Sequence, residues 1–327
     1  MNIHREFRRI FCMIVALLGI LATTTVTDAQ QRKVPRVGFL ALARFVPPKL
    51  FLEDLEKLGF VDGKNLSIEY HFADGKHDQM RALAAELVRS NVDVIFANGD
   101  EAVVAAMAET KTIPIVMLSC DALAMGFVPS LARPGGNITG VTCISVELSP
   151  KRVEVFKELF PGLSHIAVIY NPENVAKPFD AKGTIAAAEK LGIKGHYREV
   201  REKDDLEPAF AATAAAGANG VIVLSEAFTL IHRQLIVDLA LKHRLPDMHV
   251  YREFADTGGL VSFGPNVQEM LRQTARHLAK VLNGERAGDL PVEQPTTFDF
   301  VINSKRAKAL DLSIPTSSLL QATDVVQ

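Results

Sequence analysis

The chain alternates short runs of β-branched and apolar residues with longer amphipathic runs, and this alternation restricts the fold more than any other feature. The first short run, at 34–42, is continuous and not alternating, which is typical of a parallel strand buried on both faces. The short runs of the first third fall at 34–42, 65–73, 92–98 and 112–118, with helical patterns at 47–60, 77–90 and 101–110 between them. A strand–helix series of this kind predicts a doubly wound parallel sheet.

The series is interrupted once, at 130–142, where the sequence reads SLARPGGNITGVT. Pro134 lacks a backbone donor and Gly135 and Gly136 favour positive φ, so a helix cannot continue through them. The same alternation then restarts. A helix is predicted from Ser149 as its N-cap with Pro150 in its first position, followed by strands and helices that include one long helix over 230–244. The interruption is therefore interpreted as a linker between two lobes.

The C-terminal part predicts a return to the first lobe. A helical pattern over 266–284 precedes an extended stretch at 289–303, which contains Pro291 and Pro295. A chain that ended in the second lobe would need no second extended link. The expected fold is α/β, with two doubly wound parallel-sheet lobes joined by a three-crossover hinge around a cleft. We expect the first lobe to comprise 30–144 plus 264–292, and the second 145–263 plus 293–327. A length of 327 residues suits two cores.

The first 29 residues resemble an export signal. Arg5, Arg8 and Arg9 precede an apolar run, and the small residues Thr27 and Ala29 suit cleavage after Ala29. A membrane anchor is the alternative, but the run is about 16 residues against the roughly 20 needed for a span. The sequence does not distinguish export by the general secretory route from export by the twin-arginine route. We therefore expect the mature protein in the periplasm.

Two cysteines remain after the signal, Cys120 and Cys143. In an oxidising compartment they could form a disulfide, although cysteine is also often simply buried, and we favour burial. A third alternative is a pair of thiols acting as acid and base in a cleft enzyme. The sequence leaves the three open.

Catalytic signatures are otherwise lacking in the sequence. It has no GxGxxG after a strand, no phosphate loop, and neither GxSxG nor HExxH. Its scattered histidines suggest no metal site, so we expect no catalytic residue, metal or cofactor. The net charge of −2 and the absence of tryptophan give no reason to expect a nucleic-acid partner.

Polar groups at the predicted carboxyl ends of strands are the best candidates for ligand binding, because doubly wound sheets bind ligands there. Each of these groups could instead have a purely structural role: Asp100 could be the N-cap of a helix, and Asn171 could be part of a turn. The candidates are Ala41, Leu42, Asn98, Gly99, Asp100, Ser119, Asp121, Asn171, Glu226, Tyr251 and Arg252.

Several segments together resemble the ABC-transporter substrate-binding family, whose better-known members bind tryptophan and other aromatic amino acids. The matching segments are 55–88, 130–141, 147–152, 242–266 and 289–303. The resemblance implies a type I periplasmic-binding-protein fold with a small solute held between the lobes. It also implies delivery to an ABC permease in the inner membrane.

Two departures from the family pattern bear on the ligand. Gly99-Asp100-Glu101 stands where such proteins often carry Gly-Thr-Pro or Gly-Ser-Pro, and Cys120-Asp121-Ala122 replaces Gly-Asp-Pro. A hydroxyl at a helix N-terminus would help to hold a carboxylate, whereas acidic side chains compete for the same donors. We therefore hypothesise that the ligand presents an ammonium or several hydroxyls to Asp100 and Asp121. Phe45 and Tyr251 are the few aromatic candidates near the cleft.

Three functions compete at this level. The first is a solute-binding protein for an ABC importer, taking an amino acid, an amine or a similar polar solute. The second is a sensor that presents its closed form to a membrane receptor, and the third is a secreted cleft enzyme. A repressor's effector domain has the same fold, but the export signal argues against it.

Overall fold

The first of two sheets contains five parallel strands in the order β2-β1-β3-β4-β5. The computed structural model describes residues 34–44 and 48–327, and Pro35–Gln327 form one compact unit. Side chains alternate between the two faces of β1, so Phe39 packs under α2 and α11 while Leu40 packs under α3 and α4. The strands are β1 (Arg36–Ala41), β2 (Ser67–Phe72), β3 (Val94–Asn98), β4 (Ile115–Cys120) and β5 (Ile138–Cys143).

The second sheet has seven strands in the order β12-β11-β10-β9-β8-β6-β7. All neighbours are parallel except β10 and β11, which pair antiparallel. The strands are β6 (His165–Tyr170), β7 (Lys194–Glu199), β8 (Gly220–Val223), β9 (Asp247–His249), β10 (Val261–Pro265), β11 (Phe298–Asn303) and β12 (Asp324–Val326).

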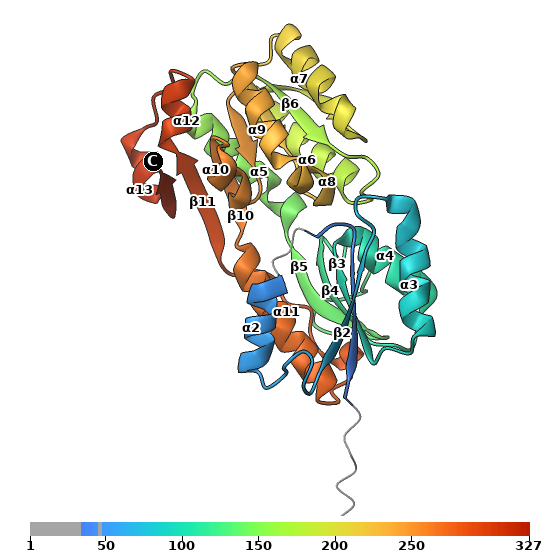
Figure 1. The fold of residues 1–327 in the computed structure, drawn as a ribbon. Helices are drawn as coiled ribbons and strands as arrows, with labels where there is room; N and C mark the ends of the chain where they lie inside the picture. The colour runs from blue at the N-terminus through green and yellow to red at the C-terminus, as the bar shows by residue number, and fades with distance from the viewer. Residues whose placement is uncertain (1–33, 45–47) are drawn as a thin grey trace, which may run out of the picture. The chain divides into compact units, whose positions relative to one another are not determined.

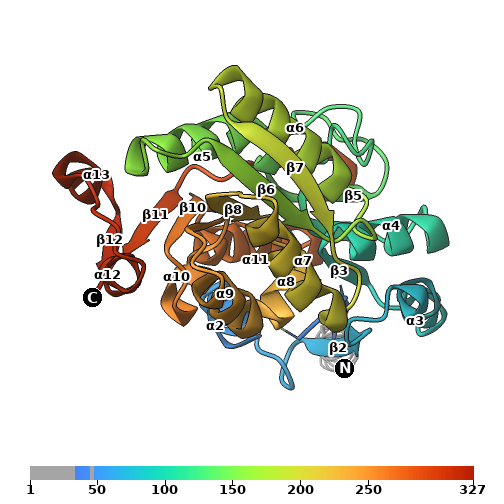
Figure 2. The same cartoon turned by 90° about the horizontal axis from the view of Figure 1, so that it is seen from above.

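Helices cover both faces of each sheet, as the prediction of two doubly wound lobes requires (Figures 1 and 2). In the first lobe, α2 and α11 lie on one face, and α3 and α4 on the other. In the second, α5 and α6 cover one face while α7, α9 and α10 cover the other. The helices are α2 (Pro48–Lys57), α3 (Met80–Arg89), α4 (Asp100–Glu109), α5 (Ser145–Leu159), α6 (Lys177–Lys190), α7 (Leu206–Ala215), α8 (Ala227–Ile231), α9 (Arg233–Lys242), α10 (Arg252–Thr257), α11 (Val267–Leu282), α12 (Ser304–Ala309) and α13 (Thr316–Gln321); short 3-10 turns lie at His77–Gln79, Lys203–Asp205 and Ala287–Asp289.

The chain passes between the two sheets three times. It leaves the first between β5 and α5, returns between β10 and α11, and crosses again along the extended segment before β11 (Figure 1). Along that last segment, Thr142 donates its backbone N–H to the carbonyl of Glu293 and Glu293 donates to that of Gly140, so the third crossing lies beside the first. The lobe boundaries at 144, 263 and 292 stay a prediction about which parts move together.

Two helix boundaries differ from the sequence prediction. Helix α5 begins at Ser145, so Ser149 is no N-cap and Pro150 lies inside the helix. Tertiary contacts explain the earlier start, because the backbone N–H of Val146 donates to Asp121 and the Ser149 hydroxyl donates to Asp180. The single helix predicted over 230–244 is also wrong: α8 and α9 are separate and meet at His232.

Within 34–44 and 48–327, no helix is both long enough and apolar enough to span a bilayer. The predicted export signal over 1–29 lies outside the described residues, as does Phe45.

Candidate functional site

A cavity of about 150 Å³ lies between the carboxyl ends of strands from the two sheets. The carboxyl ends of β3, β4 and β5 and the start of α4 contribute to one wall, and the segment entering α6, the region from the turn before α8 to the start of α9, and α10 contribute to the other. This is where doubly wound sheets place ligands. Seven of the predicted residues line it: Leu42, Asn98, Gly99, Asp100, Ser119, Glu226 and Tyr251.

The other four predicted residues do not line this cavity. Ala41 belongs to β1 and faces the core under α2. Asn171 is fully buried and accepts the backbone N–H of Glu173 at 3.0 Å, which makes a turn. The guanidinium of Arg252 donates to the Asp256 carboxylate at 3.2 Å and is occupied outside the cavity.

Asp121, the fourth, lies at the first crossing between the lobes. Its Oδ1 accepts the backbone N–H of Val146 at 3.4 Å, and the residue borders a separate hollow together with Leu123 and Glu147. Burial raises its pKa to about 7. Its carboxyl group therefore contacts the start of α5 and not the main cavity.

Sequence reasoning missed four polar residues that line the cavity. Ser225 directly precedes the predicted Glu226, so extending that strand end by one position would have found it. No local pattern distinguishes the others from ordinary surface residues. The missed residues are Asn174, Lys177, Ser225 and Arg233, whereas the acidic groups Glu101 and Glu253 follow predicted residues at strand ends and do line the cavity.

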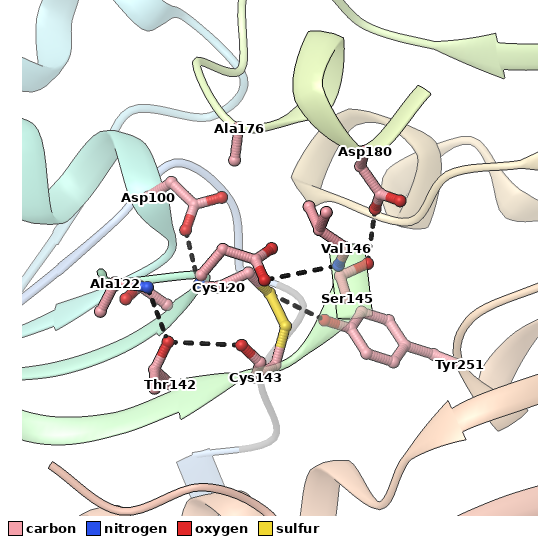
Figure 3. The surroundings of a disulfide bond; sticks show 12 residues. Asp100, Cys120, Ala122, Thr142, Cys143, Ser145, Val146, Ala176, Asp180 and Tyr251 are labelled. Atoms are coloured by element: carbon pink, nitrogen blue, oxygen red, sulfur yellow. Dashed lines mark hydrogen bonds between the residues drawn. A yellow bond between two sulfur atoms is a disulfide. The ribbon is translucent and has the colours of Figure 1, made fainter. Parts of the chain in front are cut away.

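Asp100 joins three segments of the cavity wall. It lies in the first turn of α4, and its Oδ1 accepts the backbone N–H of Cys120 at 2.8 Å (Figure 3). Its Oδ2 accepts the side-chain amide of Asn174 from the second lobe at 3.3 Å. The same amide donates to Glu101 Oε1 at 2.9 Å. Asp100 therefore has protein partners on both oxygens, and Asn174 connects the lobes at the cavity.

A buried charge cluster centred on Asp180 supports the second-lobe wall. Asp180 accepts hydroxyl hydrogen bonds from Ser145 and Ser149 (the former drawn in Figure 3). Its oxygens lie 3.9 Å from Arg152 Nη1 and 4.0 Å from Lys177 Nζ. All three charged side chains are at most 2 % exposed, so each charge depends on the others for compensation. Burial alone would lower the pKa of Lys177, but the carboxylates of Asp180 and Asp100 raise it above its ordinary value.

The acidic groups of the cavity have strongly perturbed protonation. Burial, followed by the charges of Asp100 and Glu226, raises the pKa of Glu101 to about 8. Burial likewise raises the pKa of Glu226 to about 7, although that side chain accepts the backbone N–H groups of Phe228 and Thr229 as the N-cap of α8. Burial also raises the pKa of Glu253. Glu101 and Glu226 therefore hold protons near neutral pH unless a cation approaches them.

Cys120 and Cys143 form a disulfide in the cavity wall (Figure 3). They are register partners at the ends of the neighbouring parallel strands β4 and β5, and the Tyr251 hydroxyl lies 3.9 Å from Cys120 Sγ. The favoured interpretation as unpaired buried cysteines is therefore wrong. The alternative of a thiol acid–base pair fails as well, because a disulfide offers no thiol.

Three polar atoms at the cavity have no hydrogen-bond partner in the described part of the protein. They are the amide Nδ2 of Asn98, the Oγ of Ser225 and the Oε2 of Glu253. Asn98 and Ser225 are at most 5 % exposed. Buried polar groups are normally satisfied, so these atoms are suited to a polar ligand.

Comparison with known proteins agrees with this geometry. A family model described as "ABC transporter substrate binding protein" matches residues 48–326. The chain belongs to the ABC transporter substrate-binding protein family. It is 28 % identical over 270 residues to a tyrosine-binding protein of Clostridioides difficile, covering 81 % of this chain and 76 % of that protein.

Solved structures resemble this substrate-binding protein over most of its length. One is a conserved domain protein of Vibrio cholerae, with 27 % identity, a TM-score of 0.84, and coverage of 90 % of this chain and all (100 %) of that one. Another, from Streptococcus pneumonia in complex with L-Trp, has 21 % identity, a TM-score of 0.83 and coverage of 90 % and 100 %. The family match and the fold make this chain a solute-binding protein for ABC transport, in a family of binding proteins and not of enzymes.

Proposed function

We propose that this protein captures an amino acid, an amine or a similar polar solute in the cavity between its lobes, outside the cytoplasm. It then passes the solute to an ABC permease in the inner membrane, without chemical change. The observation that carries this proposal is the convergence of polar side chains from both sheets on one cavity that includes unpartnered buried atoms.

Closure of the lobes over the solute supplies the mechanism. Asn174 of the second lobe donates to Glu101 and Asp100 of the first, and Tyr251 lies against Cys120. These contacts depend on the lobes being close together. A solute that touches both walls favours this arrangement by the difference between its affinities for the closed and open forms.

Homology supports the class of solute. The tyrosine-binding relative and the L-Trp complex are similar to this chain over most of its length. The export signal predicted from the sequence agrees with a protein that works outside the cytoplasm.

The test is the melting temperature of the purified protein against a panel of amino acids, amines, polyols and small organic acids. The protein is first unfolded and refolded without reductant to remove any solute carried through purification. A compound that binds only the folded state increases the free energy of unfolding by about 2.7 kcal/mol at a hundred times its Kd, and the melting temperature rises accordingly. A saturable rise with at least one class supports the proposal, and no rise with any class contradicts it.

A further inference from the structure

We propose that the solute is an organic cation with an apolar body, bearing an amine but no compensating carboxylate, whose ammonium group lies among Glu101, Glu226 and Glu253. This inference rests on the proposed function and narrows it to one ligand class. It differs from the zwitterionic amino acids named for the two relatives.

The charges on the cavity wall are the first support. Four carboxyl groups line the cavity, those of Asp100, Glu101, Glu226 and Glu253, against the two cationic side chains of Lys177 and Arg233. Lys177 is already paired with Asp180. The wall therefore carries an excess of acid that a zwitterion would not compensate and a cation would.

The origin of the three glutamates is the second support. Glu101 comes from α4 of the first lobe, whereas Glu226 and Glu253 come from the turn before α8 and from α10 in the second. Burial raises the pKa of each of the three, and the charges of Glu101 and Glu226 oppose each other. An ammonium group between them converts this repulsion into attraction across the two lobes, so a cation favours the closed form specifically.

Unpartnered buried atoms and apolar side chains describe the rest of the ligand. The Asn98 amide, the Ser225 hydroxyl and Glu253 Oε2 line the cavity without a hydrogen-bond partner in the described part of the protein, so a ligand can bind to them. The remaining lining is largely apolar and includes Leu42, Leu118, Leu230 and Met270. A hydrocarbon or aromatic body fits this surface better than a polyol.

The cationic group itself is organic. No three His, Cys, Asp or Glu side chains in the described chain converge in a way that would hold a metal ion. A primary ammonium donates up to three hydrogen bonds to oxygens about 3 Å from its nitrogen, so it draws carboxylates of the two walls towards one point.

The experiment compares amino acids with the amines that differ from them only by loss of the carboxylate: tyrosine with tyramine, tryptophan with tryptamine, lysine with cadaverine, and arginine with agmatine. Isothermal titration calorimetry on the refolded protein gives the Kd of each. We expect at least one amine to bind at least about tenfold more tightly than its parent amino acid, the size of one hydrogen bond to a charged group.

Tighter binding of the amino acids would overturn the inference, with Arg233 or Lys177 holding their carboxylate, while leaving the proposed function intact. Binding only of neutral polyols or organic acids would do the same. Failure of all these classes to bind would overturn both the inference and the proposed function.

A second measurement separates direct contact from general electrostatics. Glu101→Gln keeps the oxygen that accepts from Asn174 and removes the charge, and we expect it to weaken amine binding by about tenfold or more. Glu158→Gln, at an exposed position of α5, makes the same change in net charge and is expected to change the Kd by less than about twofold. Equal effects of the two variants would contradict the placement of the ammonium.

Proton release provides an independent readout in the same titrations. His77, Asp100, Lys177 and Glu226 are the titratable groups that face Glu101 from the surrounding segments, and its pKa of about 8 leaves it protonated at neutral pH. A bound ammonium displaces that proton, so the binding enthalpy in the wild type should depend on the ionisation enthalpy of the buffer. This dependence should fall in Glu101→Gln. Proton uptake on amine binding would contradict the inference.

Discussion

Loss of the Cys120–Cys143 disulfide should destabilise the first lobe by an amount set by the length of chain that it closes. The cysteines are 23 residues apart in sequence, and the cross-link restricts the unfolded chain over that loop. The loop-entropy relation gives about 3 kcal/mol at 25 °C. With a urea dependence of about 2 kcal/mol per molar, the unfolding midpoint of this lobe should fall by about 1 to 2 M.

The assay is urea unfolding followed by far-ultraviolet circular dichroism, on the wild type and on Cys120→Ala/Cys143→Ala, each with and without reductant. Cys143 is 0 % exposed, so the reductant reduces the disulfide when the lobe unfolds. In the presence of reductant the unfolded wild type therefore lacks the cross-link, as the double variant does. We expect reductant to lower the midpoint of the wild type to near that of the double variant and to leave the variant unchanged. A wild-type midpoint that is unaffected by reductant would refute the reasoning.

Three further perturbations have definite expected outcomes. Asp180→Asn leaves the Lys177 ammonium buried without its partner and should lower the free energy of unfolding by about 3 to 5 kcal/mol, measured by urea unfolding; a loss below about 1 kcal/mol would show that the charge cluster is unimportant. Gly140→Ala would place a Cβ 2.1 Å from the Met117 carbonyl oxygen at a φ of +133°, so soluble expression or melting temperature should drop sharply, and a wild-type melting curve would be inconsistent with this packing. Folding raises the pKa of Glu101 from 4.5 to about 8, so its protonated form stabilises the ligand-free protein below pH 4.5 and this contribution is lost as the pH rises towards 8. Glu101→Gln should therefore flatten the decline in melting temperature between these pH values. Parallel plots of melting temperature against pH for the variant and the wild type would contradict this.

The alternation of apolar runs was sufficient to predict the layers of the fold, because parallel strands buried on both faces and amphipathic helices have distinct local patterns. It could not predict where α5 begins. That boundary depends on Asp121 and Asp180, which reach Val146 and Ser149 from distant parts of the chain. The Pro at position 150 favoured a later start locally, and the tertiary contacts override this preference.

The candidate site was predictable only where it follows strand ends. Asn98, Asp100 and Ser119 could be chosen because doubly wound sheets bind ligands at that edge. Lys177 could not, since it lies in the first turn of a helix, where a lysine is usually at the surface; here it is buried by its pairing with Asp180. The disulfide was likewise beyond local reasoning, because only the parallel register of β4 and β5 brings Cys120 opposite Cys143.

The most direct test of the central claim is whether solute binding draws the two lobes together. Small-angle X-ray scattering of the refolded, solute-free protein is compared with the same protein saturated with a compound that raises its melting temperature. The account predicts a smaller radius of gyration in the bound state, with the change titrating at the Kd from calorimetry. Saturable binding with an unchanged radius of gyration would contradict capture of the solute by closure of the lobes.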